Sequence, residues 1–186
     1  MTKVDLKLFV QGYYLENGLM RSVAYNQDEN NPTNEVENVI VALHDSTGVV
    51  EQSSGMLYTD GSVSVSFSEQ GDFYLSVKGT NSLQLFTPTA LSFNGTDVSY
   101  DFTVQSENQF EVESGVFASY SGDINGDGVI DASDEALLVE AINNSLFGVQ
   151  VSDLNGDGSV DNTDSDLLFA NLGKEVVYPI GLPKPQ

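Results

Sequence analysis

The chain has no cysteine among its 186 residues, which excludes disulfide bonds, thiolate nucleophiles and zinc sites built on thiolates. It also lacks any run of about 18 apolar residues, so we expect no insertion into a membrane. Basic residues are scarce, because six lysines and arginines face 28 aspartates and glutamates, giving a formal net charge of −22. Such a field repels nucleic acid and attracts cations, so nucleic acid is not an expected partner.

The first part of the chain alternates between apolar and polar residues. The clearest stretch is 62–68, where Val63, Val65 and Phe67 alternate with four serines. Similar alternation occurs at 4–10, 39–43, 73–77 and 98–104. A period of two with one apolar face is typical of strands packed on one side, and turn residues separate the runs. We therefore predict an antiparallel β-sandwich, with residues 12–35 forming a long polar surface loop.

Two segments of the last third repeat one another at a spacing of 30 residues. Residues 123–134 read DINGDGVIDASD and residues 153–164 read DLNGDGSVDNTD. Calcium is a hard cation that takes about six to eight oxygen ligands, and calcium loops supply them from positions 1, 3, 5, 7, 9 and 12. The repeat therefore predicts two sites, each for one Ca²⁺.

The predicted ligands follow from these loop positions. They are Asp123, Asn125, Asp127, Val129, Asp131 and Asp134 in the first loop, and Asp153, Asn155, Asp157, Ser159, Asp161 and Asp164 in the second. Val129 and Ser159 at position 7 contribute only a backbone carbonyl, whereas position 12 is expected to be a bidentate carboxylate. Gly128 and Gly158 stand at position 6, where the sharp turn requires a positive φ.

Each loop precedes an apolar pattern at helical spacing. Residues 134–144 and 164–174 are predicted helices, with the position-12 carboxylate near the helix N-terminus, where negative charge is favoured. The apolar faces comprise Leu137, Leu138, Ala141 and Ile142 in the first helix, and Leu167, Leu168 and Leu172 in the second. Ile130 and Val160 at position 8 are expected to join the two loops through a short β-like contact.

Position 12 is Asp rather than the Glu of the common EF-hand, and the residues before the first loop, 119–122, do not read as a helix. With the duplicated loops, these features make residues 122–174 resemble a dockerin domain. The resemblance implies an internal pseudo-two-fold symmetry and a cohesin-like protein partner. It also implies that this partner contacts loop positions 10 and 11, which here are Ala132-Ser133 and Asn162-Thr163.

The remainder of the chain has two weaker resemblances. Residues 36–80 resemble the prealbumin-like or carboxypeptidase-regulatory-like sandwiches of bacterial surface proteins. The "LKLFVQGYY", "GDFYLSVK" and "YSGDINGDGVID" segments together are similar to C-terminal modules of large secreted proteins of Bacteroidetes-type bacteria. We expect a β-sandwich over residues 1–118 and a dockerin-like domain with a C-terminal tail over 119–186. No Pro- or Ser-rich linker separates them, so they should pack together.

These observations favour a non-catalytic function. Once the clustered acids are assigned to calcium, no catalytic constellation is recognisable, so we expect no enzyme. The first hypothesis is a calcium-binding attachment module, secreted or on the bacterial cell surface, whose protein partner is cohesin-like or a component of the surface or secretion machinery. The alternatives are a C-terminal sorting or anchoring signal of an exported protein and a carbohydrate-binding module. Calcium that only stabilises the fold is a further interpretation.

Overall fold

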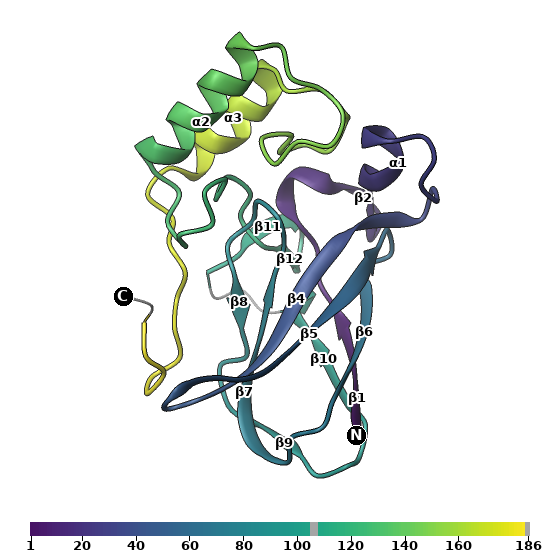
Figure 1. Ribbon diagram of the computed structural model, residues 1–186, viewed down its shortest axis with the longest axis vertical. Helices are drawn as coiled ribbons and strands as arrows, with labels where there is room; N and C mark the ends of the chain where they lie inside the picture. Colours follow the sequence, from purple (N-terminus) through teal and green to yellow (C-terminus); the bar gives the residue numbers. More distant parts are fainter. Residues whose placement is uncertain (105–107, 185–186) are drawn as a thin grey trace.

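The computed structural model describes residues 1–104 and 108–184, and it is mainly β with a small helical part at one end (Figure 1). The strands are β1 (Thr2–Lys7), β2 (Tyr14–Glu16), β3 (Leu19–Met20), β4 (Glu35–Asp45), β5 (Gly48–Tyr58), β6 (Ser62–Phe67), β7 (Gly71–Lys78), β8 (Leu85–Phe86), β9 (Leu91–Phe93), β10 (Val98–Asp101), β11 (Phe110–Glu113) and β12 (Val116–Ala118). The helices are α1 (Val23–Gln27), α2 (Ala132–Asn143) and α3 (Asn162–Asn171), with 3-10 turns η1 (Gln11–Tyr13) and η2 (Phe102–Val104).

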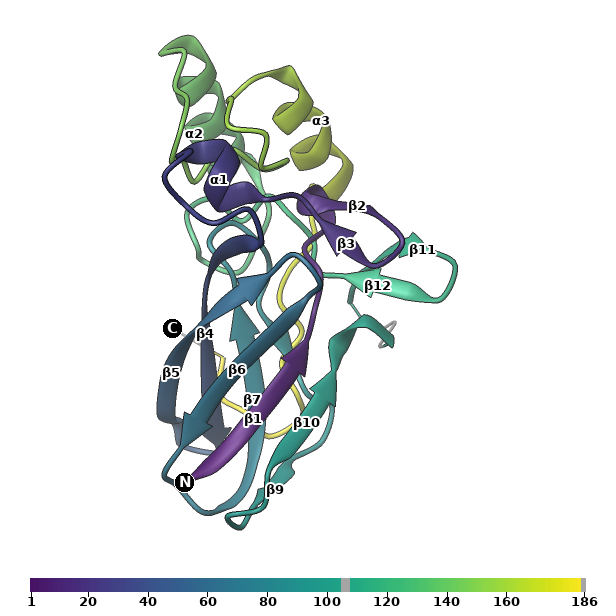
Figure 2. The same cartoon turned by 90° about the vertical axis from the view of Figure 1, so that its right-hand side faces the viewer.

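Two sheets form the β-sandwich, as the alternation predicts. One sheet has the order β10-β1-β6, and Figure 2 shows these strands side by side. The other has the order β5-β4-β7-β8, with β9 also paired to β7. Among the strands of the described residues, the pairs are antiparallel except for β1 and β10, which run parallel. Two further hairpins, β2-β3 and β11-β12, lie outside the sandwich sheets.

The core between the sheets explains the period of two. In β6 the three apolar side chains are buried, whereas the alternating serines are exposed. Val4 and Leu6 of β1 lie opposite Val65 and Val63 of β6, and all four belong to the same buried cluster. The facing sheet contributes β4 and β7 side chains to that cluster, including Leu43, which is fully buried. Burial of these apolar surfaces is the main favourable term for this half of the molecule.

The predicted alternation over residues 98–104 is wrong beyond Asp101. Phe102 to Val104 form η2 instead, and Val104 is 69% exposed. The reason is local, because the Asp101 carboxylate accepts bonds from the backbone N–H (2.8 Å) and the hydroxyl (2.6 Å) of Thr103. An aspartate that caps the backbone two residues on favours a turn over a continued strand.

Residues 12–35 do not form the plain surface loop that their polarity predicts. They include part of η1, the β2-β3 hairpin and α1, and they cover the end of the sandwich nearest α2 and α3 (Figure 2). Tyr13 is buried, and its hydroxyl donates to the Asn81 side-chain carbonyl at 3.2 Å. The segment is ordered because it packs on residues distant in sequence, which a local reading of polarity cannot detect.

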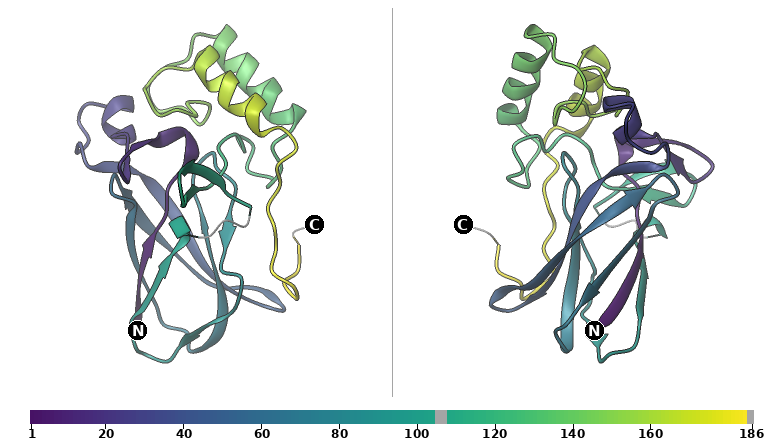
Figure 3. Two further views of the ribbon diagram at one scale, coloured as in Figure 1. Left: turned by 180° about the vertical axis from the view of Figure 1, so that it is seen from behind. Right: turned by 45° about the vertical axis from the view of Figure 1, so that its right-hand side comes forward.

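Helices α2 and α3 lie side by side over one end of the sandwich in both views of Figure 3. Each begins two residues earlier than its apolar pattern predicts. The predicted buried faces hold for Leu138, Ala141 and Leu168, which are at most 4% exposed. They fail for Leu137 and Leu172, which are 40% and 43% exposed. Leu172 follows the end of α3, so helical spacing no longer governs its direction.

The sandwich and the helical part share a second hydrophobic cluster, so the expected direct packing is present. Leu83 and Phe86 from the sandwich belong to it together with Ile130 and Leu154 from the two loops. Polar contacts extend the interface: Asn81 donates from its side chain to the backbone carbonyls of residues 151 and 153, at 3.0 and 3.2 Å.

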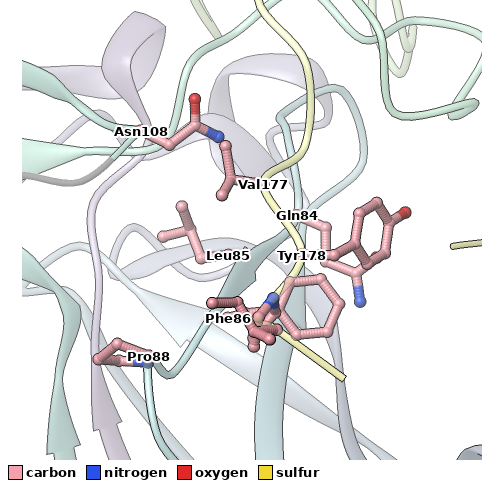
Figure 4. A pocket seen from close by; sticks show the side chains of 9 residues that line it. Gln84, Leu85, Phe86, Pro88, Asn108, Val177 and Tyr178 are labelled. Atoms are coloured by element: carbon pink, nitrogen blue, oxygen red, sulfur yellow. The ribbon is translucent and has the colours of Figure 1, made fainter. Parts of the chain in front are cut away.

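The C-terminal tail descends from α3 along the sandwich (Figure 1). Tyr178 packs against Phe86 of β8 with ring centroids 5.2 Å apart. A cavity of about 230 Å³ lies between the tail, at Val177 and Tyr178, and the β8 segment. Figure 4 shows the side chains that line it. The tail therefore forms a third connection between the two parts of the molecule.

The close backbone contact at Gly12 provides a first test of the interface between the sandwich and the helical part. A Cβ on residue 12 would lie 2.0 Å from the carbonyl oxygen of Leu154, which is backbone and cannot swing away. We expect Gly12→Ala to lower the free energy of unfolding by about 1–3 kcal/mol, because overpacking forces the two parts to separate. Denaturant unfolding measures this. Ser66→Ala on the exposed face of β6 is the control and should change stability by less than about 0.5 kcal/mol; equal effects would contradict the interface.

Candidate calcium site

The two predicted loops adopt the same backbone path. Gly128 and Gly158 at position 6 have φ of 88° and 92°, the left-handed region that favours glycine. At position 3, Asn125 and Asn155 accept through the side-chain oxygen from the backbone N–H of position 5, at 2.9 and 2.8 Å. The carboxylate at position 5 then accepts from the N–H of position 7 in both loops. Repetition of each bond shows that the pseudo-two-fold symmetry extends to the hydrogen bonds.

Position 12 closes each loop through its carboxylate. Asp134 accepts from the backbone N–H groups of residues 124, 125 and 131 at 2.8–3.1 Å. Asp164 accepts from the equivalent residues 154, 155 and 161 at 2.7–3.0 Å. Both aspartates are fully buried. A single side chain therefore joins the start of the loop to the start of the helix.

Position 9 begins each helix. Asp131 is the N-cap of α2 and accepts from the backbone N–H of Ser133 at 2.7 Å, and Asp161 caps α3 through Thr163 at 2.8 Å. With the position-12 aspartate bonded back to the N-cap N–H, each helix starts with a reciprocal capping box. The sequence pattern of the calcium loop is thus also the sequence pattern of a helix start.

Position 1 carries a second pair of fully buried acids. Asp123 and Asp153 are both fully buried, and one oxygen of each accepts from the N–H of the position-6 glycine, at 3.2 and 3.0 Å. The other oxygen of Asp123 is buried and has no hydrogen-bond partner. An ionised carboxylate in such a place is costly unless a cation or further donors compensate it.

Burial sets the direction of the pKa shifts. Loss of solvation raises the pKa of Asp123 and of Asp153, and it raises the pKa of Asp164 to about 6. Backbone N–H groups oppose this shift of the Asp164 pKa, and the neighbouring Asp153 carboxylate adds to it. A bound divalent cation favours the ionised form of each group, so ion binding and deprotonation are linked.

The expected direct contact between the loops through position 8 is wrong. The Ile130 N–H donates to the carbonyl of Lys174, and the Val160 N–H donates to the carbonyl of Leu146. Each loop therefore pairs with the segment that follows the helix of the other motif. The position-8 side chains Ile130 and Val160 are both buried, and each motif contributes a backbone acceptor to the loop of the other.

Residues of α1 and β7 supply further loop contacts that sequence reasoning missed. Lys78 donates from its ammonium to the carbonyl of Gly126 at 2.6 Å. Asn26 donates to the carbonyl of Gly156 at 2.8 Å, and Gln27 donates to the Asp153 carboxylate at 2.9 Å. These residues lie 48 to 130 positions away along the chain and form no motif with the loops, so no local signal identifies them.

The residues present fit a calcium ion by the chemistry of their donors. Across residues 1–104 and 108–184, no three Asp, Glu, His or Cys side chains are already gathered as a metal cluster. The loop carboxylates hold backbone N–H groups instead: Oδ1 of Asp134 and of Asp164 each accepts two, whereas Oδ2 of each accepts one and keeps a second lone pair. Side-chain and carbonyl oxygens of both loops are the hard ligands that calcium takes, and the buried Oδ1 of Asp123 has no hydrogen-bond partner.

The fold and this pair of loops define a class of protein: two calcium-type loop–helix motifs joined to a β-sandwich. Residues 121–173 match the family model of the dockerin type I domain, a kind of domain that binds calcium. The chain therefore carries a dockerin-like domain after a β-sandwich.

Two solved structures share the fold over most of the chain. Both are crystal structures of type II cohesin–X–dockerin complexes from Acetivibrio cellulolyticus, one a C-terminal and one an N-terminal interface mutant. The TM-scores are 0.56 and 0.53, with 17% and 16% identity, and each match covers 94% of this chain and 97% of that chain. At this identity the likeness concerns the fold. No curated protein sequence matches the chain.

The position-12 carboxylate provides a test that is independent of metal. Asp164→Ala removes the acceptor of three backbone N–H groups, so we expect the metal-free protein to lose about 2 kcal/mol of unfolding free energy or more. Asp166→Ala, on the exposed surface of α3, is the matched control and should cost less than about 0.5 kcal/mol. Chemical denaturation in a chelator measures both, and no difference between the variants would contradict the closing role of Asp164.

Proposed function

We propose that the chain is a calcium-dependent attachment module that works outside the cell or on its surface. Each loop binds one Ca²⁺ through the oxygen ligands at positions 1, 3, 5, 7, 9 and 12, and the dockerin-like part docks to a cohesin-like protein. The single observation that carries this proposal is the duplicated loop with matching hydrogen bonds, seated within a match to the dockerin type I domain. The proposed division is a sandwich over residues 1–118 and a dockerin-like domain with its tail over 119–186.

The surface of α2 and α3 supports a protein partner. Val139 and Phe169 are 46% and 50% exposed and line one groove with Ile142 and Asp166. Exposed apolar side chains rimmed by polar ones are typical of binding surfaces. The hydroxyls of Ser133 and Thr163 at loop position 11 are also exposed, although both accept from the position-3 asparagine.

An extracellular setting agrees with the composition. Calcium sites of extracellular modules have dissociation constants of about 10⁻⁴–10⁻³ M, which suits the calcium levels found outside cells. The chain has no cysteine to oxidise and few basic residues. Among the described residues, no helix is long and apolar enough to cross a membrane.

Calcium removal is the first test. Binding to the folded state alone stabilises it by about 2.7 kcal/mol per site at 100 times the dissociation constant, so chelation should lower the melting temperature by about 10 °C or more. Differential scanning calorimetry in calcium and in chelator measures this, and isothermal titration should give two ions per chain. The double variant Asp127→Ala/Asp157→Ala is the control, because it should lose the response to calcium. An unchanged melting temperature in the parent protein would contradict the calcium sites.

Partner binding is the second test. The family match is to type I dockerins, whereas the similar folds come from type II complexes, so immobilised cohesins of both types are needed. We expect surface plasmon resonance to detect binding in calcium and none in chelator. Phe169→Ala should weaken binding about tenfold or more, because exposed aromatic anchors dominate interfaces. Ile180→Ala in the exposed tail should have no effect. Two bound ions without binding to either cohesin would leave calcium with a purely stabilising role.

A further inference from the structure

The two calcium loops meet the sandwich through different side chains at equivalent positions. In the second loop the neutral amide of Gln27 donates to Oδ2 of Asp153, the position-1 carboxylate, at 2.9 Å. In the first loop the ammonium of Lys78 lies 3.7 Å from Oδ2 of Asp123, also at position 1. In both loops this same oxygen accepts from the position-6 glycine. The symmetry of the loops is therefore broken by one unit of positive charge.

The charge of Lys78 is unusual in this chain. The sequence has only six lysines and arginines, and of the two ion pairs among the described residues, one joins exposed Lys3 and Asp5. The other joins Lys78 to the fully buried Asp123. Lys78 also donates to the carbonyl of Gly126 at 2.6 Å, which fixes the ammonium against the loop.

Partial burial of the Lys78 side chain limits how far water and salt screen its charge. The Lys78 side chain is 30% exposed, and Val176 and Tyr178 of the C-terminal tail line the same recess as Gly126 and Gly128. Charges separated from bulk water interact more strongly than exposed ones. A divalent cation bound by Asp123 would therefore be repelled by the nearby ammonium, whereas the neutral amide of Gln27 brings no positive charge to the second loop.

The same ammonium has the opposite effect when no ion is bound. The four buried carboxylates at positions 1 and 12 then lack a metal, and Lys78 compensates one of them in the first loop. An unpaired buried charge is strongly destabilising, so this pair holds the metal-free first loop against β7.

We propose that Lys78 makes the first calcium site the weaker of the two and keeps the first loop packed on the sandwich before that site fills. This inference rests on the proposed binding of one ion by each loop. The second loop then fills at a lower calcium concentration than the first loop. Because Lys78 belongs to the sandwich, the sandwich sets the calcium concentration at which both loops of the dockerin-like part are filled.

The test is a calcium titration of the full chain followed by NMR, with the Gly128 and Gly158 amides as separate reporters of the loops. The wild-type Gly158 signal should saturate first. Lys78→Met should raise the affinity of the first loop about three- to tenfold and leave the second loop within about twofold. Lys78→Arg, which keeps the charge, should behave like wild type. Gln27→Lys should weaken the second loop by a similar factor.

The outcomes separate this inference from the proposed function. Two ions bound with a first loop that is unaffected or weakened in Lys78→Met would overturn the role of Lys78 and leave the calcium sites intact. Wild-type filling of the first loop before the second would also overturn it. Absence of binding at both loops would instead remove the proposed function and the inference with it.

Melting temperatures give a readout that a merely structural lysine would not produce. Lys78→Met should melt below wild type in chelator, because Asp123 loses its counter-ion, but not in saturating calcium. An equal loss of melting temperature under both conditions would assign Lys78 a packing role only and overturn the inference.

Discussion

Burial of four carboxylates in a chain of net charge −22 is the constraint on which the helical half of the structure depends. Asp123, Asp134, Asp153 and Asp164 are all fully buried, and burial of an ionised group is costly unless donors or a cation surround it. The backbone meets part of this cost, since Asp134 and Asp164 each accept three N–H bonds. Those same bonds close the loops and start α2 and α3, so the fold of this region and its affinity for cations have one origin.

The sandwich takes part in the calcium-binding region and does not merely precede it. Lys78 of β7 and Gln27 of α1 each lie at the position-1 carboxylate of a loop, and Asn81 holds the backbone where the second loop begins. The close backbone approach of Gly12 to Leu154 leaves no space for even a methyl group. Contacts of this kind couple the packing of the loops to the packing of the sandwich.

The arrangement leaves the remaining surface of the helices free for a partner. The loops and the buried side chains of α2 and α3 pack against the sandwich and the tail, whereas Val139 and Phe169 stay exposed and line one groove. An attachment module needs this division, since one face must be rigid and the other accessible. The acidity of the chain adds long-range repulsion toward other acidic surfaces.

The sequence by itself determined the elements whose cause is local. Alternation at β6 gave the buried face, and the loop repeat gave the positive-φ glycines and the helix starts, because these depend on residues within twelve positions of one another. The sequence pattern wrongly predicted that Leu137 and Leu172 are buried, and it wrongly predicted that residues 12–35 form a plain surface loop. Only the tertiary structure decided how position 8 pairs, with Ile130 bonded to Lys174 rather than to the other loop, and which side chains of the sandwich face the loops. Those contacts join residues up to 130 positions apart, and the free energy of packing that selects them has no trace in a local pattern.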